Sequence, residues 1–333
     1  MKNIYVFKIL VSLLYIFFTI LPLEGQTRKS PQSEGAYVFS VAPVFGFLYG
    51  HAEELVYKKA DSDTLLSQLI WDIKPLFLWG FSADIYRRYP MEKPGFFMNL
   101  TTQFSFPTNT GTMEDRDWQA AEDRLSHFSS HDNYTNWATL MDLSAGISVP
   151  VISRLVFKFH AGFDYMYFNW TAQNGYAQYG KELSPGVFSP WNENIPKVYQ
   201  SGTVISYIQY WFILTPGFSL YIPYRFFSVN LDFQISPLII CLDQDNHPLR
   251  NPPLQFNDYM FWGLFLEPTG EFTLSFHERI SLSAYVSYRL IKGPRGLTMI
   301  KNMANNITVR DSNKAGAAYS ALGAGLSLKI QIR

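Results

Sequence analysis

Charged residues are scarce in this chain. They make up 16% of its 333 residues, with 27 basic and 27 acidic side chains. A soluble domain of this size usually carries about a quarter charged residues, so the composition argues against an ordinary soluble protein. Because the two signs balance, the net charge gives no reason to expect nucleic acid as a partner.

Cysteine is almost absent. The single one, Cys241, can form neither an intrachain disulfide nor a zinc site built from cysteines. It lies in an apolar stretch, where we expect a small buried side chain. The sequence also lacks G-x-S-x-G and H-E-x-x-H, so it shows no motif for a serine nucleophile or for a zinc protease.

Long apolar runs are limited to the N-terminus. Two lysines there accompany an apolar stretch from Ile9 to Leu23, which is the pattern of a secretory signal. An uncleaved anchor helix is the alternative, but the strand pattern beyond it favours removal. We therefore expect residues 1–25 to be a cleaved signal peptide and residues 26–333 to form one domain. No other stretch reaches the ~20 apolar residues of a spanning helix.

What the chain has instead is aromatic residues, at 17% of the total, and alternation with period two. Apolar side chains occupy every second position of residues 227–236, 280–289 and 322–332, with polar or small residues between them. Such alternation predicts strands with one polar and one apolar face. Together with the low charge, it predicts an all-β fold, an antiparallel transmembrane β-barrel of about ten strands in a bacterial outer membrane.

The connections between these stretches also favour a barrel. Short connections are expected near residues 149–154, 221–225 and 277–280. Longer polar stretches lie at about 51–66, 107–132, 172–202, 242–257 and 295–314. Short periplasmic turns that alternate with long extracellular loops are typical of outer-membrane barrels.

Two acidic motifs lie in the polar stretches. One is C-L-D-Q-D-N-H, where Asp243, Asp245 and His247 occupy alternate positions. The other is G-T-M-E-D-R-D-W, where Asp115 and Asp117 do the same. Alternate side chains of a strand share one face, and a carboxylate beside an imidazole can make water nucleophilic near neutral pH. We expect the two motifs to face each other across one rim of the barrel.

The first of these motifs would lie on the wrong face if the strand before it were regular. Residues 227–235 put odd positions toward lipid, which would send Asp243 and Asp245 outward. The apolar run that begins at Pro237 breaks the alternation, and proline is typical of β-bulges. We therefore predict a bulge near Ser236 and Pro237 that turns the motif inward.

The motif residues have other interpretations. Asp243, Asp245 and His247 could bind Zn, Mn or Ca ions, because carboxylate and imidazole groups suit them. They could equally be solvated polar residues on a barrel without activity. Spacing alone favours the solvated loop over metal binding or catalysis.

Both motifs, in this order, resemble those of the omptin family of bacterial outer-membrane aspartic-type proteases. The similarity spans most of the mature chain. It is also carried by E-L-V-Y at 54–57, S-Q-L-I-W at 67–71 and the final strand A-G-A-A-Y-S-A-L-G-A-G-L. The resemblance implies an endopeptidase that cleaves next to basic residues, with its active site facing the cell exterior.

The resemblance implies catalytic roles for four residues. Asp245 and His247 would form the pair that activates water. Asp115 and Asp117 would lie opposite and help to hold that water and the transition state. Neither a metal nor another cofactor is implied.

The resemblance also implies a substrate pocket. Glu54 and Asp243 would bind the basic side chain before the cleaved bond, and Met113 would line the neighbouring pocket. The family's lipopolysaccharide motif, Tyr-x-Glu-x-Arg, corresponds here to F-D-Y-M-Y at Phe163–Tyr167, without the Glu or the Arg. Activation by lipopolysaccharide is therefore not supported for this chain, although outer-membrane lipid surrounds any such barrel.

Two functions of different classes follow from the sequence. The first is an outer-membrane endopeptidase acting on peptides or proteins with basic residues. The second is a non-catalytic barrel, porin-like or adhesive, that keeps the scaffold without the chemistry. The retention of both acidic motifs favours the protease, and a barrel of about ten strands has a lumen largely filled by side chains.

Overall fold

The computed structural model describes residues 37–60, 62–87, 93–152 and 154–332, so the predicted signal peptide, residues 1–25, lies outside the described residues. Nearly all of the described chain is β-strand. The barrel strands are β1 (Tyr37–Tyr57), β2 (Leu65–Arg87), β3 (Gly95–Ser105), β4 (Thr108–Asp117), β5 (His127–Ile152), β6 (Leu155–Tyr179), β10 (Thr203–Tyr224), β11 (Phe227–Ser236), β12 (Ile239–His247), β13 (Leu254–Phe261), β14 (Leu264–His277), β15 (Ile280–Lys292), β16 (Arg295–Asn302) and β17 (Ile307–Ile332).

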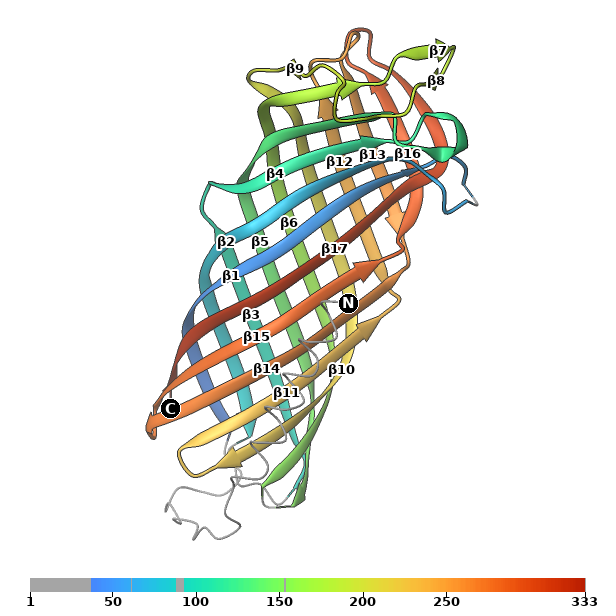
Figure 1. The fold of residues 1–333 in the computed structure, drawn as a ribbon. Helices are drawn as coiled ribbons and strands as arrows, with labels where there is room; N and C mark the ends of the chain where they lie inside the picture. Colours follow the sequence, from blue (N-terminus) through green and yellow to red (C-terminus); the bar gives the residue numbers. More distant parts are fainter. Residues whose placement is uncertain (1–36, 61, 88–92, 153, 333) are drawn as a thin grey trace. The chain divides into compact units, whose positions relative to one another are not determined.

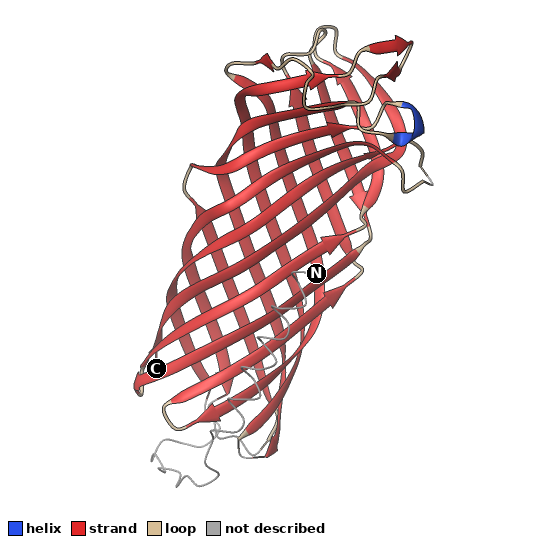
Figure 2. Cartoon of the chain, in the orientation of Figure 1, coloured by secondary structure: helices blue, strands red, loops and turns tan. Residues whose placement is uncertain are grey.

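These strands pair antiparallel in a closed ring (Figures 1 and 2). β1 pairs with β2 on one side and with β17 on the other, which closes the barrel. Four strands are interrupted, so that β3 and β4, β11 and β12, β13 and β14, and β15 and β16 each form one strand in two parts. With each counted once, the ring has about ten strands, which confirms the predicted fold.

The barrel strands extend further than the polar stretches of the sequence suggested. β1 continues to Tyr57 and β6 to Tyr179, so much of what was expected as loop is strand. The three short strands β7 (Glu182–Ser184), β8 (Val187–Phe188) and β9 (Val198–Tyr199) lie in the connection that follows β6. Within the described ranges, the only helical element is the turn η1 (Ala121–Asp123), and no helix is long and apolar enough to cross a membrane.

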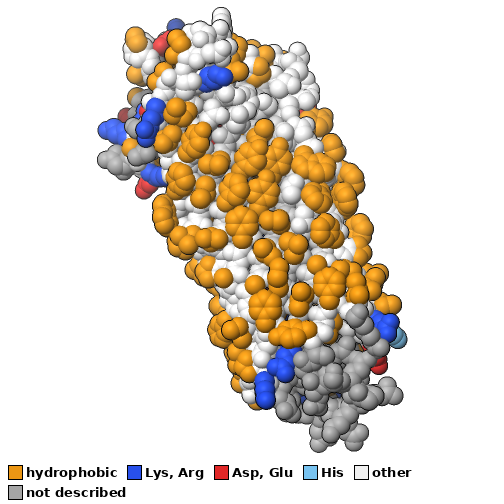
Figure 3. Space-filling model, turned by 180° about the vertical axis from the view of Figure 1, so that it is seen from behind, with side chains coloured by type: hydrophobic (Ala, Val, Ile, Leu, Met, Phe, Trp, Pro, Cys, Tyr) orange, Lys and Arg blue, Asp and Glu red, His pale blue; other side chains and the backbone are white. Residues whose placement is uncertain are grey.

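An apolar surface surrounds the middle of the barrel. Figure 3 shows hydrophobic side chains gathered over the barrel wall, with Lys and Arg near the two ends. On β1 the exposed apolar side chains end at Tyr49, and His51 and Glu53 follow on the outward face; on β12 they end at Ile240. Beyond these residues the outer face meets water, so period-two alternation no longer marks the strands. The two acidic motifs lie in this upper part of the barrel, beyond the lipid-facing belt.

The predicted bulge is present. Along β10, Gly217 pairs with Gln234 and Ile213 with Ile239, so the chain between β11 and β12 holds one residue more than its partner. The amide of Leu238 donates to Ser236 Oγ at 2.9 Å inside the bulge. Odd positions therefore face outward before the bulge and inward after it, which confirms the inward direction predicted for the motif on β12.

The interruptions of three neighbouring strands lie side by side and form what we call the bulge seam, residues 236–239, 262–263 and 293–294. The amides of Trp262 and Gly263 donate to the carbonyls of Ile239 and Pro237, at 2.9 and 3.2 Å. Because the interruptions are aligned, the strands of the seam keep the same pairing register with one another on both sides of it. The one-residue change of register occurs only against the flanking strands β10 and β17.

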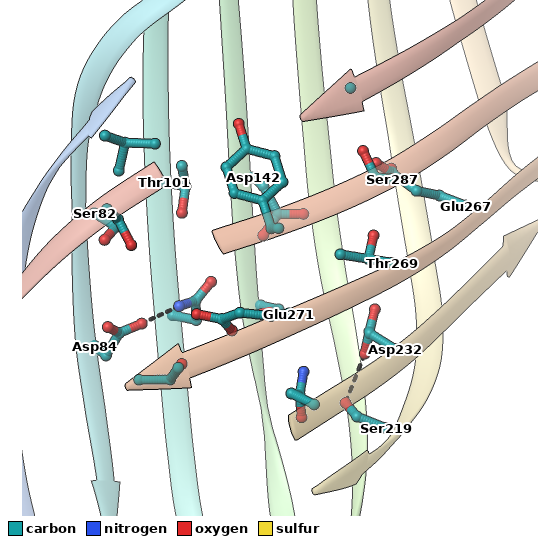
Figure 4. Close-up of a pocket in the computed structure, with 18 of the residues that line it drawn as sticks. Ser82, Asp84, Thr101, Asp142, Ser219, Asp232, Glu267, Thr269, Glu271 and Ser287 are labelled. Carbon is teal, nitrogen blue, oxygen red and sulfur yellow. Dashed lines mark hydrogen bonds between the residues drawn. The ribbon is translucent and has the colours of Figure 1, made fainter. Parts of the chain in front are cut away.

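The lumen at the membrane level is polar and contains a cavity of about 430 Å³ (Figure 4). Ion pairs line it: Arg289 Nε donates to Glu267 Oε2 on the neighbouring strand at 2.7 Å, and Lys329 Nζ donates to Glu271 Oε1 at 2.7 Å. Asp232 accepts from Ser219 Oγ at 2.6 Å, as Figure 4 shows. This cavity is separate from both acidic motifs.

A layer of stacked aromatic side chains closes the lumen above the cavity. Trp71 stacks on Tyr207 with ring centroids 5.1 Å apart, and Trp170 stacks on Phe168 at 4.8 Å. All four are completely buried. Tyr319 packs against Phe168 and also lines the cavity, so the layer separates the cavity from the upper barrel.

Candidate active site

β12 carries Asp245 and His247 side by side on its inner face. Both are buried, because the bulge places the odd positions of β12 inside the barrel. His247 Nε2 donates a hydrogen bond to Asp245 Oδ2. The edge of the imidazole lies against Phe256 of β13, with ring centroids 5.4 Å apart. These two contacts fix the ring and leave Nδ1 as the nitrogen not used by Asp245.

β4 carries the second pair, Asp115 and Asp117. Ser67 of β2 lies opposite Asp117 in the sheet and donates from Oγ to Asp115 Oδ1 at 3.3 Å. The same hydroxyl hydrogen-bonds Asp117. One serine thus contacts both carboxyl groups, which lie on the same face of β4 because they belong to alternate residues of the strand.

The two pairs are close enough to interact electrostatically across the lumen. Burial raises the pKa of Asp115, and the charges of Asp117 and Asp245 add to this effect while Arg250 opposes it. Burial also raises the pKa of Asp117, against a smaller opposing contribution from His247. Two partly buried carboxyl groups with raised pKa values, facing an Asp–His pair, can hold a proton as well as a negative charge.

A separate acidic pocket lies beside the Asp–His pair. Glu54 of β1 and Asp243 of β12 are both buried, and Tyr207 of β10 donates from its hydroxyl to Asp243 Oδ2 at 2.8 Å. Burial, followed by the charges of neighbouring carboxylates, raises the pKa values of Glu54 and Asp243. Glu54 Oε2 and Asp243 Oδ1 have no hydrogen-bond partner among the described residues. Buried acceptors without donors favour the binding of a cation.

The hydroxyl of Tyr207 is oriented by a chain of side chains along β10. Trp211 Nε1 donates to Gln209 Oε1 at 2.8 Å, and Gln209 Nε2 donates to the Tyr207 oxygen at 2.9 Å. Because its oxygen already accepts from Gln209, the hydroxyl directs its own hydrogen to Asp243. Tyr207 also belongs to the buried aromatic layer below, which forms the floor of the pocket.

The structure brings together six of the seven residues singled out in the sequence. The seventh, Met113, lies two residues before Asp115 on β4 and is completely buried in the apolar core, paired with Trp71 of β2. Its role in lining a neighbouring substrate pocket stays a prediction. Sequence reasoning assigned no role to Ser67, Tyr207 or Asp258, which also surround the site. Ser67 stands in the quoted S-Q-L-I-W stretch, but the other two carry no local signal.

Metal ligation was one alternative interpretation of the motif on β12. Among the residues that the structure describes, no group of three or more His, Cys, Asp or Glu side chains is arranged to hold a metal ion. Cys241, two residues before Asp243, is completely buried in the apolar core, and burial raises the pKa of its thiol.

Comparison with known proteins assigns the family. A model of the Omptin family matches residues 36–331. This chain belongs to the Omptin family. A search of the curated proteins gives no match. The omptin resemblance inferred from the two acidic motifs is therefore confirmed.

Among solved structures, this omptin barrel is similar to the outer membrane protease OmpT from Escherichia coli. The TM-score is 0.77 at 17% sequence identity, over 89% of this chain and 97% of that chain. At this identity the likeness shows the fold alone, which is that of an outer-membrane β-barrel. The translocator domain of the autotransporter NalP from Neisseria meningitidis matches with a TM-score of 0.32 and 9% identity, over 97% of this chain and 96% of that chain.

Proposed function

We propose that this omptin is an outer-membrane endopeptidase that hydrolyses peptide bonds next to basic residues, with its site open to the cell exterior. The observation that carries the proposal is the Asp245–His247 hydrogen bond facing the Asp115–Asp117 pair. Family membership and the barrel fold support a protease in general terms. The buried acidic pocket beside the pair supports a preference for a cationic side chain.

The reaction follows from the positions of the proton acceptors. A water molecule between the two pairs attacks the scissile carbonyl carbon, and its proton passes to His247 Nδ1 while Nε2 stays bonded to Asp245. Because burial raises the pKa values of Asp115 and Asp117, one of these carboxyl groups can keep a proton and donate it to the carbonyl oxygen. When the carbon–nitrogen bond breaks, the imidazolium gives its proton to the leaving amine, and the hydroxyl formed from the carbonyl oxygen returns its proton to the Asp carboxylate as the new carboxyl product forms.

The test is hydrolysis of a fluorogenic peptide containing Arg-Arg or Arg-Lys by refolded protein in detergent. Asp245→Ala and His247→Ala should each lower kcat by about 100- to 10,000-fold, the usual range for loss of general base catalysis. The loss should appear in kcat rather than KM, because neither side chain belongs to the acidic pocket.

Two matched substitutions serve as controls. His277→Ala changes a histidine beside a turn at the opposite end of the barrel, and Asp132→Asn changes an exposed acidic residue of β5. Both should keep full activity. Undiminished hydrolysis by folded Asp245→Ala or His247→Ala would contradict the mechanism, and activity abolished by a chelator would favour the metal alternative.

A further inference from the structure

A third buried carboxyl group faces the acidic pocket. Asp258 of β13 pairs directly with Asp243 across the β12–β13 ladder, and both side chains point inward. Opposite side chains of an antiparallel pair have Cβ atoms about 5 Å apart, so the two carboxyl groups share one space. Asp258 is 2% exposed, compared with 4% for Glu54 and 5% for Asp243.

Each of these three carboxyl groups presents an oxygen without a partner. Among the described residues, Glu54 Oε2, Asp243 Oδ1 and Asp258 Oδ1 are buried and accept no hydrogen bond. Their other contacts come from the barrel wall: Tyr207 donates to Asp243 Oδ2, and Thr298 hydrogen-bonds Asp258. Oxygens buried in this way on three strands can each accept a hydrogen bond from an incoming cationic side chain.

The wall between Asp258 and Glu54 is built from small side chains. The strands between β13 and β1 are β16 and β17, which contribute Thr298, Ala315 and Ala317 to the inner face at this level. Glu54 and Asp258 are near enough for the charge of Asp258 to act on Glu54.

We infer that Asp258 is a specificity-determining residue of this pocket and makes it select an arginine side chain over a lysine. The inference rests on the proposed function, which it deepens by naming the preferred cation. A guanidinium spreads five N–H donors over a plane and can reach acceptors on several sides. An ammonium places three donors on one nitrogen and is more strongly hydrated, so it satisfies acceptors on three separate strands less well.

The test compares two peptides that differ only in Arg or Lys before the cleaved bond, at pH 8. Asp258→Asn, similar in size and uncharged, should lower kcat/KM for the Arg peptide by about 10- to 100-fold. The Lys peptide should lose much less, so that the Arg-to-Lys ratio falls by about 10-fold. Asp132→Asn is the matched control, because it removes one carboxylate from the outer face of β5, and should leave the ratio unchanged.

A binding measurement separates recognition from chemistry. Butylguanidine should inhibit the wild type more strongly than butylamine, and Asp258→Asn should remove most of that difference. If Asp258→Asn does not fold, Asp258→Ser, with a smaller side chain, replaces it. Asp258→Glu, which restores the charge, should recover a preference for Arg.

The outcomes distinguish this inference from the proposed function. If the wild type cleaves at basic residues and folded Asp258→Asn keeps the same Arg-to-Lys ratio and inhibition, the role of Asp258 is overturned and the protease remains. If the wild type cleaves no peptide, the proposed function fails. Calorimetry with butylguanidine and butylamine then still tests the pocket, and equal or absent binding overturns the inference.

Discussion

Asp258 contributes a negative charge where the folded chain offers little to stabilise it. Burial, with a further contribution from Asp245, raises its pKa to about 7, against the opposing hydrogen bond from Thr298. Asp243 and Glu54 face the same space. A pocket built for a cation is therefore a source of instability when it is empty, which is a common cost of binding sites.

The pH dependence of stability follows from the raised pKa of Asp258. A carboxyl whose pKa is higher in the folded than in the unfolded chain stabilises the fold at low pH, and this stabilisation is lost as the pH rises from about 4 through about 7. Asp258→Asn should therefore unfold at a higher temperature than the wild type at pH 8, by roughly 5 °C. The difference should shrink toward zero near pH 4. Thermal unfolding in detergent at the two pH values measures it, and an equal difference at both would contradict the explanation.

At the level of strands, the bulge seam controls which residues enter the upper lumen. The extra residue between Ser236 and Ile239 reverses the inward parity of β12, and with it the direction of Asp245 and His247. Its amide at Leu238 is satisfied by the buried Ser236 hydroxyl. The seam thus depends on a side chain far from the proposed chemistry.

Ser236→Ala tests this dependence. Loss of the hydroxyl leaves the Leu238 amide without its acceptor, which should cost about 1–2 kcal/mol of stability. The unfolding temperature should fall by roughly 3–6 °C, while protein that remains folded keeps its activity. Ser281→Ala, which removes another lumen-facing hydroxyl, is the control. A wild-type unfolding temperature for Ser236→Ala would show that the hydroxyl does not hold the bulge.

The sequence predicted those features that depend on neighbouring residues. The alternation of apolar and polar residues from Phe227 to Ile235 predicted the strand. The bulge was predicted from Pro237 and from the expectation that Asp243 faces inward although the odd-numbered residues before it face lipid. Asp258 could not be recognised in this way, because its importance depends on the register that places it opposite Asp243. The parts of the strands that extend beyond the lipid-facing belt, such as β1 after Tyr49, were also missed. Their outer face meets water, so apolar residues no longer occupy every second position.

At the scale of the whole barrel, buried side chains occupy much of the lumen. The layer around Trp71 and Trp170 fills the lumen above the cavity, and the salt bridge of Arg289 with Asp164 of β6 spans the lumen at the membrane level. We expect no stable open-channel current when the protein is inserted in planar lipid bilayers, because the completely buried aromatic layer lies across the lumen above the cavity. Large, stable currents, absent with protein-free detergent, would instead favour the porin-like alternative.

Every side chain assigned a role here projects from a strand: Glu54 from β1, Asp115 and Asp117 from β4, Asp245 and His247 from β12. Strand pairing, rather than the connections, holds them in place. A protein engineer could therefore exchange the connection at residues 180–202 to admit different macromolecules, without altering the hydrolytic step. The same separation applies in evolution. The connections between the strands of such a barrel can change in sequence and length while the strand residues at the site stay the same.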